Sequence, residues 1–235
     1  MSSSLTIPTH AIGRRGPRGS GFDFRRSDLK YMMVKGFKDT IKWYDENALS
    51  YTKSCKGREY INEINYFSSL LKNKDLILDA GCGGGRDCNI FFNQDFKVIG
   101  VDISDNLIKY CQKNYPQIKF FKADFRKLPF NNNYFDGVWA HASLVHFESI
   151  KDVKKSLSEF YRVLKKDGIL YICVKEIVRK KFDVISDSLS KHLRFFQFFS
   201  TNELKKLIQF QGLKILKTYL YQGSRNTWII TFSKK

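Results

Sequence analysis

Long apolar runs, cysteines and acidic residues are all scarce in this chain of 235 residues, and the first two shortages exclude whole classes of protein. No apolar run approaches the ~20 residues that a membrane-spanning helix needs, so we expect no membrane span. The five cysteines are an odd number, and their spacings match neither a disulfide framework nor a zinc site. We therefore predict a reducing, cytoplasmic location and no bound metal.

Only 23 acidic residues oppose 41 basic ones, which gives a formal net charge of +18. A broad positive potential makes nucleic acid, an anionic membrane surface or an acidic substrate possible partners. The lysines, however, are scattered in ones and twos, a pattern that favours a solvated surface over a dedicated nucleic-acid groove. Charge alone does not name the partner.

The chain divides into two compositionally different parts. Residues 1–30 are rich in arginine, glycine and serine, and we predict a disordered basic leader there. Residues 31–235 have the length and apolar content of one α/β domain. Within it, residues 34–72 carry apolar side chains at three- and four-residue intervals, which predicts two helices ahead of the first strand.

A glycine-rich stretch follows the first apolar run of this domain. The run Leu76–Ala80 contains Asp79 near its end, and Gly81, Gly83 and Gly85 follow at alternate positions. This pattern predicts a strand, a tight loop and a helix start, where a ligand can lie against bare backbone. A dinucleotide fingerprint would need glycine in place of Arg86, and its pyrophosphate would face a carboxylate. A ligand with a cationic head suits the loop better, and S-adenosylmethionine carries both an ammonium and a sulfonium group.

A second carboxylate ends the next predicted strand. The run 96–101 stops at Asp102, where a carboxylate can accept hydrogen bonds from two ribose hydroxyls. Ile103 follows and is able to line one face of an adenine ring. Both residues fit the same adenosine-containing ligand.

These motifs resemble those of class I S-adenosylmethionine-dependent methyltransferases. The glycine loop is similar to that family's first motif, and the variants "GRD", "FDGVWAHASLVHF" and "VKE" are similar to a type 11 or tellurite-resistance-like group. The resemblance covers about residues 38–235. It implies an α/β, Rossmann-like seven-stranded mixed sheet of order 3-2-1-4-5-7-6, with helices on both faces and an N-terminal helical lid over 34–72.

The resemblance also implies a set of cofactor contacts. Asp79, Gly81 and Gly83 would hold the methionine end, Asp102 the ribose, and Asp124 with Phe125 the adenine. The segment 43–51 is similar to a lid motif, which places Tyr44 and Tyr51 over the cofactor, although both rings could instead simply pack a helix onto the sheet. The full predicted set of cofactor-binding residues is Tyr44, Tyr51, Asp79, Gly81, Gly83, Asp102, Ile103, Asp124, Phe125 and Ala140.

Catalytic and acceptor-binding candidates come from later strand ends. His141 and His146 lie where the methyl donor meets the acceptor in this family, and a histidine can take a proton from an incoming nucleophile; either could instead cap or orient the loop. Lys175, Glu176 and Arg194 are candidates for binding the acceptor. We expect residues 176–199 to be an irregular, basic insert on the substrate side.

The sequence therefore predicts an S-adenosylmethionine-dependent methyltransferase that acts on a small molecule. Two alternatives stay open: an RNA methyltransferase, acting perhaps on tRNA, which the +18 charge favours, and a non-catalytic S-adenosylmethionine-binding subunit. An Asn-Pro-Pro-Tyr-like motif is absent, which argues against nucleobase amino-group methylation. The oligomeric state is not predicted.

Overall fold

A computed structural model describes residues 36–235, apart from 56, 58–59, 178–180, 187–192 and 224–225. The predicted leader, residues 1–30, lies outside the described residues, as do parts of the predicted insert. Across the described ranges, no helix combines the length and apolar content needed to cross a membrane.

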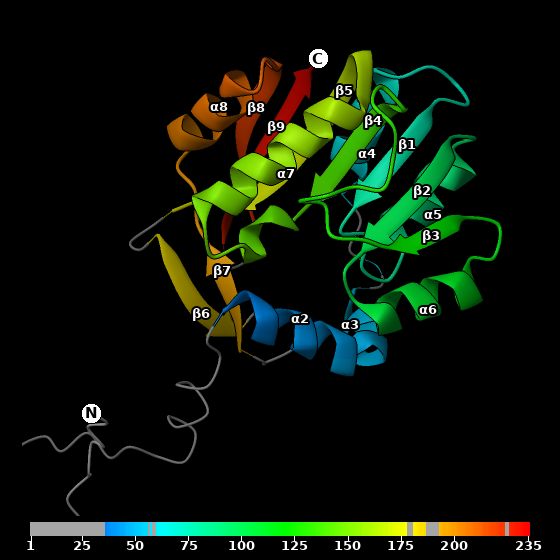
Figure 1. Ribbon diagram of the computed structural model, residues 1–235, viewed down its shortest axis with the longest axis vertical. Helices are drawn as coiled ribbons and strands as arrows, with labels where there is room; N and C mark the ends of the chain where they lie inside the picture. The colour runs from blue at the N-terminus through cyan, green and yellow to red at the C-terminus, as the bar shows by residue number, and fades with distance from the viewer. Residues whose placement is uncertain (1–35, 56, 58–59, 178–180, 187–192, 224–225) are drawn as a thin grey trace, which may run out of the picture.

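A seven-stranded mixed sheet forms the centre of the fold (Figure 1). Its spatial order is β3-β2-β1-β4-β5-β9-β8, which confirms the predicted order, because β8 and β9 are the sixth and seventh strands of this sheet along the chain. Strands β3, β2, β1, β4 and β5 are parallel, whereas β9 is antiparallel to both β5 and β8. The bounds are β1 Leu76–Ala80, β2 Lys97–Asp102, β3 Lys119–Lys122, β4 Phe135–His141, β5 Leu164–Lys175, β8 Lys214–Gln222 and β9 Thr227–Lys234.

Helices cover both faces of the sheet because the central strands are apolar on both sides. On β4, Val138 and Ala140 join the buried cluster under α7 and α8, whereas Trp139 between them joins the cluster under α4, α5 and α6. This alternation follows from the two-residue repeat of a strand. The helices are α2 Phe37–Glu46, α3 Ala48–Ser54, α4 Ile61–Ser69, α5 Arg86–Asn93, α6 Asp105–Asn114, α7 Ile150–Val163 and α8 Thr201–Phe210, with a short 3₁₀ turn, η1, over Leu144–His146.

Three described helices, not the two predicted, precede β1. The predicted first helix is interrupted between α2 and α3 at Asn47, which is outside helical geometry. Its side-chain Nδ2 donates to the carbonyl of Trp43 at 2.9 Å. Asparagine competes in this way with the regular helical hydrogen bonds, and the chain can turn there. In Figure 1, α2 and α3 lie across the edge at which the parallel strands end.

The prediction that residues 176–199 are irregular is wrong for the part that the structure describes. β6 (Phe182–Ser186) and β7 (Leu193–Gln197) pair antiparallel as a separate two-stranded sheet. β7 also lies beside α2, where the backbone N–H of Phe195 donates to Thr40 Oγ1 at 3.0 Å (Figure 1). The aromatic run in β7 has high strand propensity but shows no polar–apolar alternation, because both of its faces are buried.

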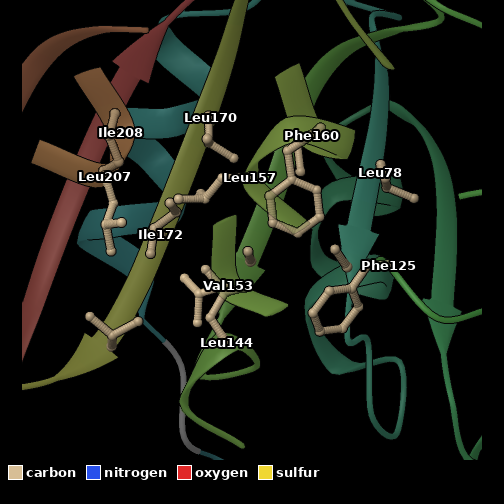
Figure 2. Packing of buried hydrophobic residues seen from close by; sticks show 14 of the residues in the cluster. Leu78, Phe125, Leu144, Val153, Leu157, Phe160, Leu170, Ile172, Leu207 and Ile208 are labelled. Carbon is tan, nitrogen blue, oxygen red and sulfur yellow. The ribbon is translucent and has the colours of Figure 1, made fainter. Parts of the chain in front are cut away.

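Helix α7 packs over β4 and β5 and contributes Val153, Leu157 and Phe160 to this side of the core (Figure 2). Phe160 is fully buried there and its ring lies 5.8 Å from that of Phe125, between centroids. Because Phe125 follows β3 at the edge where the strands end, the core is continuous with the region described below.

We expect Phe160→Ala to lower the free energy of unfolding by about 3–5 kcal/mol, since it removes a fully buried ring and leaves a cavity. Phe210→Ala on α8 is the matched control, because that ring is 78% exposed and should contribute little. Urea denaturation of both variants measures the difference. Equal losses in the two variants would contradict the assigned core.

Candidate active site

The parallel strands end around one cavity of about 640 Å³. Asp79, Asp102 and His141 come from the ends of β1, β2 and β4, and Lys175 from the end of β5. Ligands bind at this edge in open α/β sheets because the loops after successive strands converge there. The predicted residues that line the cavity are Tyr44, Tyr51, Asp79, Gly81, Gly83, Asp102, Ile103, Asp124, Phe125, His141, His146, Lys175 and Arg194.

Two predicted site residues do not line the cavity. Ala140 is fully buried in the core beneath it. Glu176 lies just beyond β5, where its backbone N–H donates to the carbonyl of Thr227 at 2.9 Å. The alternation of side chains along β5 explains the second case, because neighbours on a strand point to opposite faces.

The loop after β1 has the left-handed backbone that its glycines permit. Gly81, Gly83 and Gly85 have φ values of 84°, 53° and 76°. A Cβ atom on Gly81 would lie 2.5 Å from the Cβ of Ser143, so no larger residue fits without displacing the loop after β4. Glycine is therefore required here both for conformation and for space.

Asp79 is a buried carboxylate that lacks a cationic partner within the described part of the chain. It is 2% exposed, and the thiol of Cys88 donates to its Oδ2 at 3.1 Å. Burial, with the charge of Asp87 nearby, raises the pKa of Asp79 to about 8. A cation bound at this position would stabilise the ionised form.

Asp87, in contrast, is fully partnered. Arg86 Nε donates to it at 2.6 Å and Trp139 Nε1 at 3.0 Å. Burial alone would raise the pKa of Asp87, but the guanidinium of Arg86 holds it below its ordinary value. Of these two neighbouring acids, Asp79 is thus the one suited to bind a cationic ligand.

Asp102 organises the glycine loop and the start of α6. Its carboxylate accepts from the backbone N–H of Gly83 at 2.9 Å and from that of Ser104 at 3.0 Å. Burial raises the pKa of Asp102, and these N–H groups oppose that rise. Ser104 also caps α6, as its Oγ accepts from the backbone N–H of Leu107 at 3.2 Å.

Asp45 is a residue whose role the sequence reasoning missed. From the end of α2 it accepts from Ser104 Oγ at 2.7 Å and from the backbone N–H of Asn106 at 2.9 Å. The hydrogen bond from Asn106 lowers the pKa of Asp45. An acid at a helix N-terminus is favourable, so Asp45 holds α2 against α6. The lid motif contained this aspartate, but its partner lies 59 residues away along the chain.

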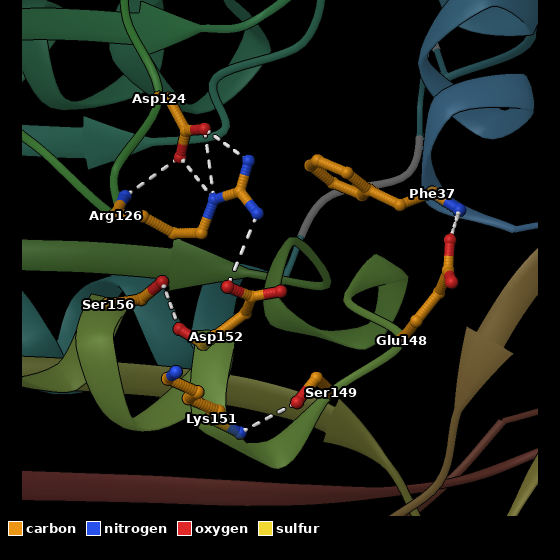
Figure 3. A network of polar contacts seen from close by, with 8 residues as sticks. All are labelled: Phe37, Asp124, Arg126, Glu148, Ser149, Lys151, Asp152 and Ser156. Carbon is orange, nitrogen blue, oxygen red and sulfur yellow. Dashed lines mark hydrogen bonds and ion pairs between the residues drawn. The ribbon is translucent and has the colours of Figure 1, made fainter.

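Asp124 already has a strong partner in this structure (Figure 3). The Arg126 guanidinium donates to both of its oxygens, Nη2 at 2.6 Å and Nε at 2.9–3.0 Å, and also pairs with Asp152 at 3.3 Å. A ligand amine would have to share these oxygens with Arg126. Of the two residues predicted to bind the adenine, Asp124 has its carboxylate occupied by Arg126, whereas the backbone at Phe125 is less occupied.

A chain of hydrogen bonds with one direction of donation joins Arg194 on β7, Tyr44 on α2 and His146 on η1. His146 Nδ1 lies 2.9 Å from the carbonyl oxygen of Phe195, which only accepts, so we assign the proton to Nδ1. His146 Nε2 then accepts from the Tyr44 hydroxyl at 3.0 Å, and that hydroxyl accepts from Arg194 Nη1. Burial, with the charge of Arg194, lowers the pKa of His146 to about 3.

His141 is also held as a neutral ring. Its Nδ1 lies 3.1 Å from the Tyr171 hydroxyl, and its ring stacks parallel to that of Tyr171. The ring of Tyr60 covers it at 4.1 Å between centroids. Burial lowers the pKa of His141 to about 4.

Comparison with known proteins identifies the family. A model described as a methyltransferase domain matches residues 78–172, from β1 into β5. An O-methyltransferase of Pyrenophora dematioidea is 30% identical over 210 residues, which are 85% of this chain and 76% of that protein. The chain belongs to the S-adenosylmethionine-dependent methyltransferases. Its sheet is that of class I, and its cofactor is S-adenosylmethionine. The alternative of a non-catalytic subunit is set aside, because the matched relatives are named as enzymes.

Other relatives of the methyltransferase carry names with different acceptors. Sterol 24-C-methyltransferase of Pneumocystis carinii is 32% identical over 120 residues, 48% of this chain and 31% of that protein. The tRNA (carboxymethyluridine(34)-5-O)-methyltransferase of Arabidopsis thaliana is 34% identical over 108 residues, 46% of this chain and 26% of that protein. The methyltransferase spans less than a third of either protein, and the acceptor is not specified by them.

A solved structure shows the same fold. The 1,6-didemethyltoxoflavin-N1-methyltransferase of Burkholderia thailandensis, with its substrate and S-adenosylhomocysteine bound, superposes with a TM-score of 0.66 at 18% identity. The match covers 85% of this chain and 86% of that one.

We expect S-adenosylhomocysteine to bind the methyltransferase more tightly as the pH rises from 6 to 8. The raised pKa of Asp79 keeps this carboxyl protonated below about pH 8, and it must ionise to hold the ligand's ammonium. Binding therefore releases a proton, and Kd should fall by up to about tenfold per pH unit. Isothermal titration calorimetry in buffers of different ionisation enthalpy measures both quantities.

Asp79→Asn should remove this pH dependence, whereas Asp75→Asn, at a half-buried position directly before the same strand, should keep it. A slope that persists in Asp79→Asn would assign the proton to another group.

We further expect Asp102→Ala to weaken S-adenosylhomocysteine binding about 10–100-fold, since hydrogen bonds to a charged group contribute about 1.5–3 kcal/mol. Asp105→Ala, three residues on and exposed, is the control and should bind like the parent protein. Calorimetry at one pH compares them, and unchanged affinity in Asp102→Ala would refute a ribose contact.

Proposed function

We propose that this enzyme transfers a methyl group to a small organic acceptor that shares one cavity with the cofactor. The observation that carries the proposal is the size and cover of that cavity. Its volume, about 640 Å³, lies within the range of small-molecule sites and has to hold both reactants. Residues of α2, α3 and β7 line it together with the strand ends, so the acceptor would be largely enclosed.

The described residues fit S-adenosylmethionine. Asp79 would bind the ammonium, because it is a buried carboxylate that lacks a cation, and the glycine loop would lie against the methionine end. Asp102 would accept from the ribose hydroxyls, and Ile103 with the backbone at Phe125 would flank the adenine. Tyr44 and Tyr51 would cover the cofactor from the lid. When bound, the cofactor supplies an already activated methyl group.

The two histidines fit alignment better than proton abstraction. With pKa values of about 3 and 4, His146 and His141 are weak bases at neutral pH. His146 Nε2 is also occupied by the Tyr44 hydroxyl. Their contribution would then be to fix Tyr44, Tyr171 and the loop after β4, and to exclude water. Such a site suits an acceptor whose nucleophilic atom carries an available lone pair without losing a proton.

An RNA acceptor is the second candidate, because the net charge of +18 and the tRNA methyltransferase among the relatives both favour it. The cover of the cavity by α2, α3 and β7 argues for a small acceptor, since a base of an RNA strand would have to leave its stack to reach the methyl donor.

A methyl-transfer screen distinguishes the two. Radiolabelled S-adenosylmethionine is incubated with the enzyme and with a metabolite extract or total RNA of the source organism. We expect label in the small-molecule fraction, and none when Asp79→Asn, which lacks the ammonium-binding carboxylate, replaces the parent enzyme. Label that appears only in RNA would contradict the proposal.

A further inference from the structure

Lys175 is the most unusual charged residue of the cavity. It is 2% exposed, and its Nζ has no hydrogen-bond partner among the described residues. The amine lies 3.6 Å from the ring centroid of Phe196 and 5.4 Å from that of Trp228. Contact with the two ring faces stabilises an ammonium only in part. A buried ammonium with no anionic partner is costly, so this position suits a partner that the described residues do not supply.

A second cation lies on the same side of the cavity. Arg194 on β7 is 1% exposed, and its guanidinium lies over the rings of Trp43 and Tyr44 at 4.8 and 4.9 Å. The acids lining the cavity come from other elements: the ends of β1 and β2, the start of α5 and the turn after β3. The acids therefore lie on the side of the glycine loop, where Arg86 is paired with Asp87, and Lys175 and Arg194 lie on the side of β5 and β7.

Burial and the charge of Arg194 lower the pKa of Lys175 to about 7, which is the response of an amine held without a counter-ion. An anion beside Nζ would restore the charged form and supply the missing hydrogen bonds. The rings of Phe196 and Trp228 beside Lys175 would pack against the apolar part of such a ligand.

We infer that the methyl acceptor is a small organic acid whose carboxylate binds Lys175, with its apolar part against Phe196 and Trp228. This rests on the proposed function, since it names the acceptor class for the same cavity. A carboxylate suits one ammonium better than a phosphate monoester does, because the additional charge and oxygens of the latter would need further donors in a site walled by rings.

Binding of matched acids and amides tests the inference without requiring turnover. Benzoate, phenylacetate and cinnamate, and the amide of each, are titrated into the enzyme with and without saturating S-adenosylhomocysteine, and calorimetry gives Kd. We expect at least one acid to bind ten or more times more tightly than its amide. Equal binding of every pair, or no binding of any of the three acids, would overturn the inference, as would a preference for phenyl phosphate over all three acids.

Lys175→Met then assigns the preference to this amine. In this variant the acid and its amide should bind within about twofold of each other, whereas S-adenosylhomocysteine should bind as in the parent enzyme. Lys97→Met, at the exposed start of β2, is the control and should keep the full preference. A preference that survives in Lys175→Met would overturn the inference.

Two further measurements distinguish a failure of this inference from a folding defect of the variant and from a failure of the proposed function. Methionine has a similar length and removes a buried charge, so the thermal midpoint of Lys175→Met should equal or exceed that of the parent. The acid–amide comparison in the parent enzyme stands even if the variant fails to fold. Loss of S-adenosylhomocysteine binding in the parent would refute the cofactor site instead, and an acceptor found only in RNA would refute the proposed function.

Discussion

The parallel alignment of β3, β2, β1, β4 and β5 is the constraint on which the site depends, because it brings five carboxyl-terminal ends to one edge of the sheet. Helices α7 and α8 cover one face of the sheet and α4, α5 and α6 the other, which buries the central strands on both faces, whereas the edge strand β3 is largely exposed. Polar side chains of the buried central strands emerge where those strands end. Asp79, Asp102, His141 and Lys175 all occupy such ends, although each belongs to a different strand.

This arrangement destabilises the fold, because ionisable groups at the strand ends are removed from water without gaining ion-pair partners among the described residues. Asp79 and Lys175 are both about 2% exposed, and neither has an ion-pair partner within the described ranges. Asp79 and Lys175 do not pair with each other, since Asp79 belongs to the glycine-loop side of the cavity and Lys175 to the side of β5 and β7. Burying an ionisable group without a partner destabilises the fold, and a bound ligand that supplies the partner removes this cost. Destabilised groups of this kind are common at functional sites.

The strand-end acids could be predicted because they follow from local patterns, whereas the sheet order was implied by the family resemblance that the motifs carry. An apolar run that stops at Asp79 or Asp102 is visible without knowing any distant contact. The hydrogen-bond chain from Arg194 through Tyr44 to His146 could not be predicted, since its members lie on β7, α2 and η1 and meet only in the folded chain. β7 was not predicted as a strand because burial of both of its faces removes the polar–apolar alternation that indicates one. Asp124 was predicted to contact the adenine, and its pairing with Arg126, two residues on, was not predicted because it depends on a side-chain conformation that spacing does not reveal.

Helix α2 connects the two sides of the cavity. At its end, Asp45 accepts from the start of α6, beside the proposed ribose contact of Asp102. Earlier in the helix, Thr40 accepts from β7 and Tyr44 donates to His146, both on the side where the acceptor would lie. Helix α2 is thus hydrogen-bonded both to α6 on the cofactor side and to β7 and η1 on the acceptor side, so its position depends on both sets of contacts. The order of the acceptor pocket is therefore tied to the elements that would hold the adenosine, and the specificity of this enzyme cannot be assigned to residues 176–199 alone.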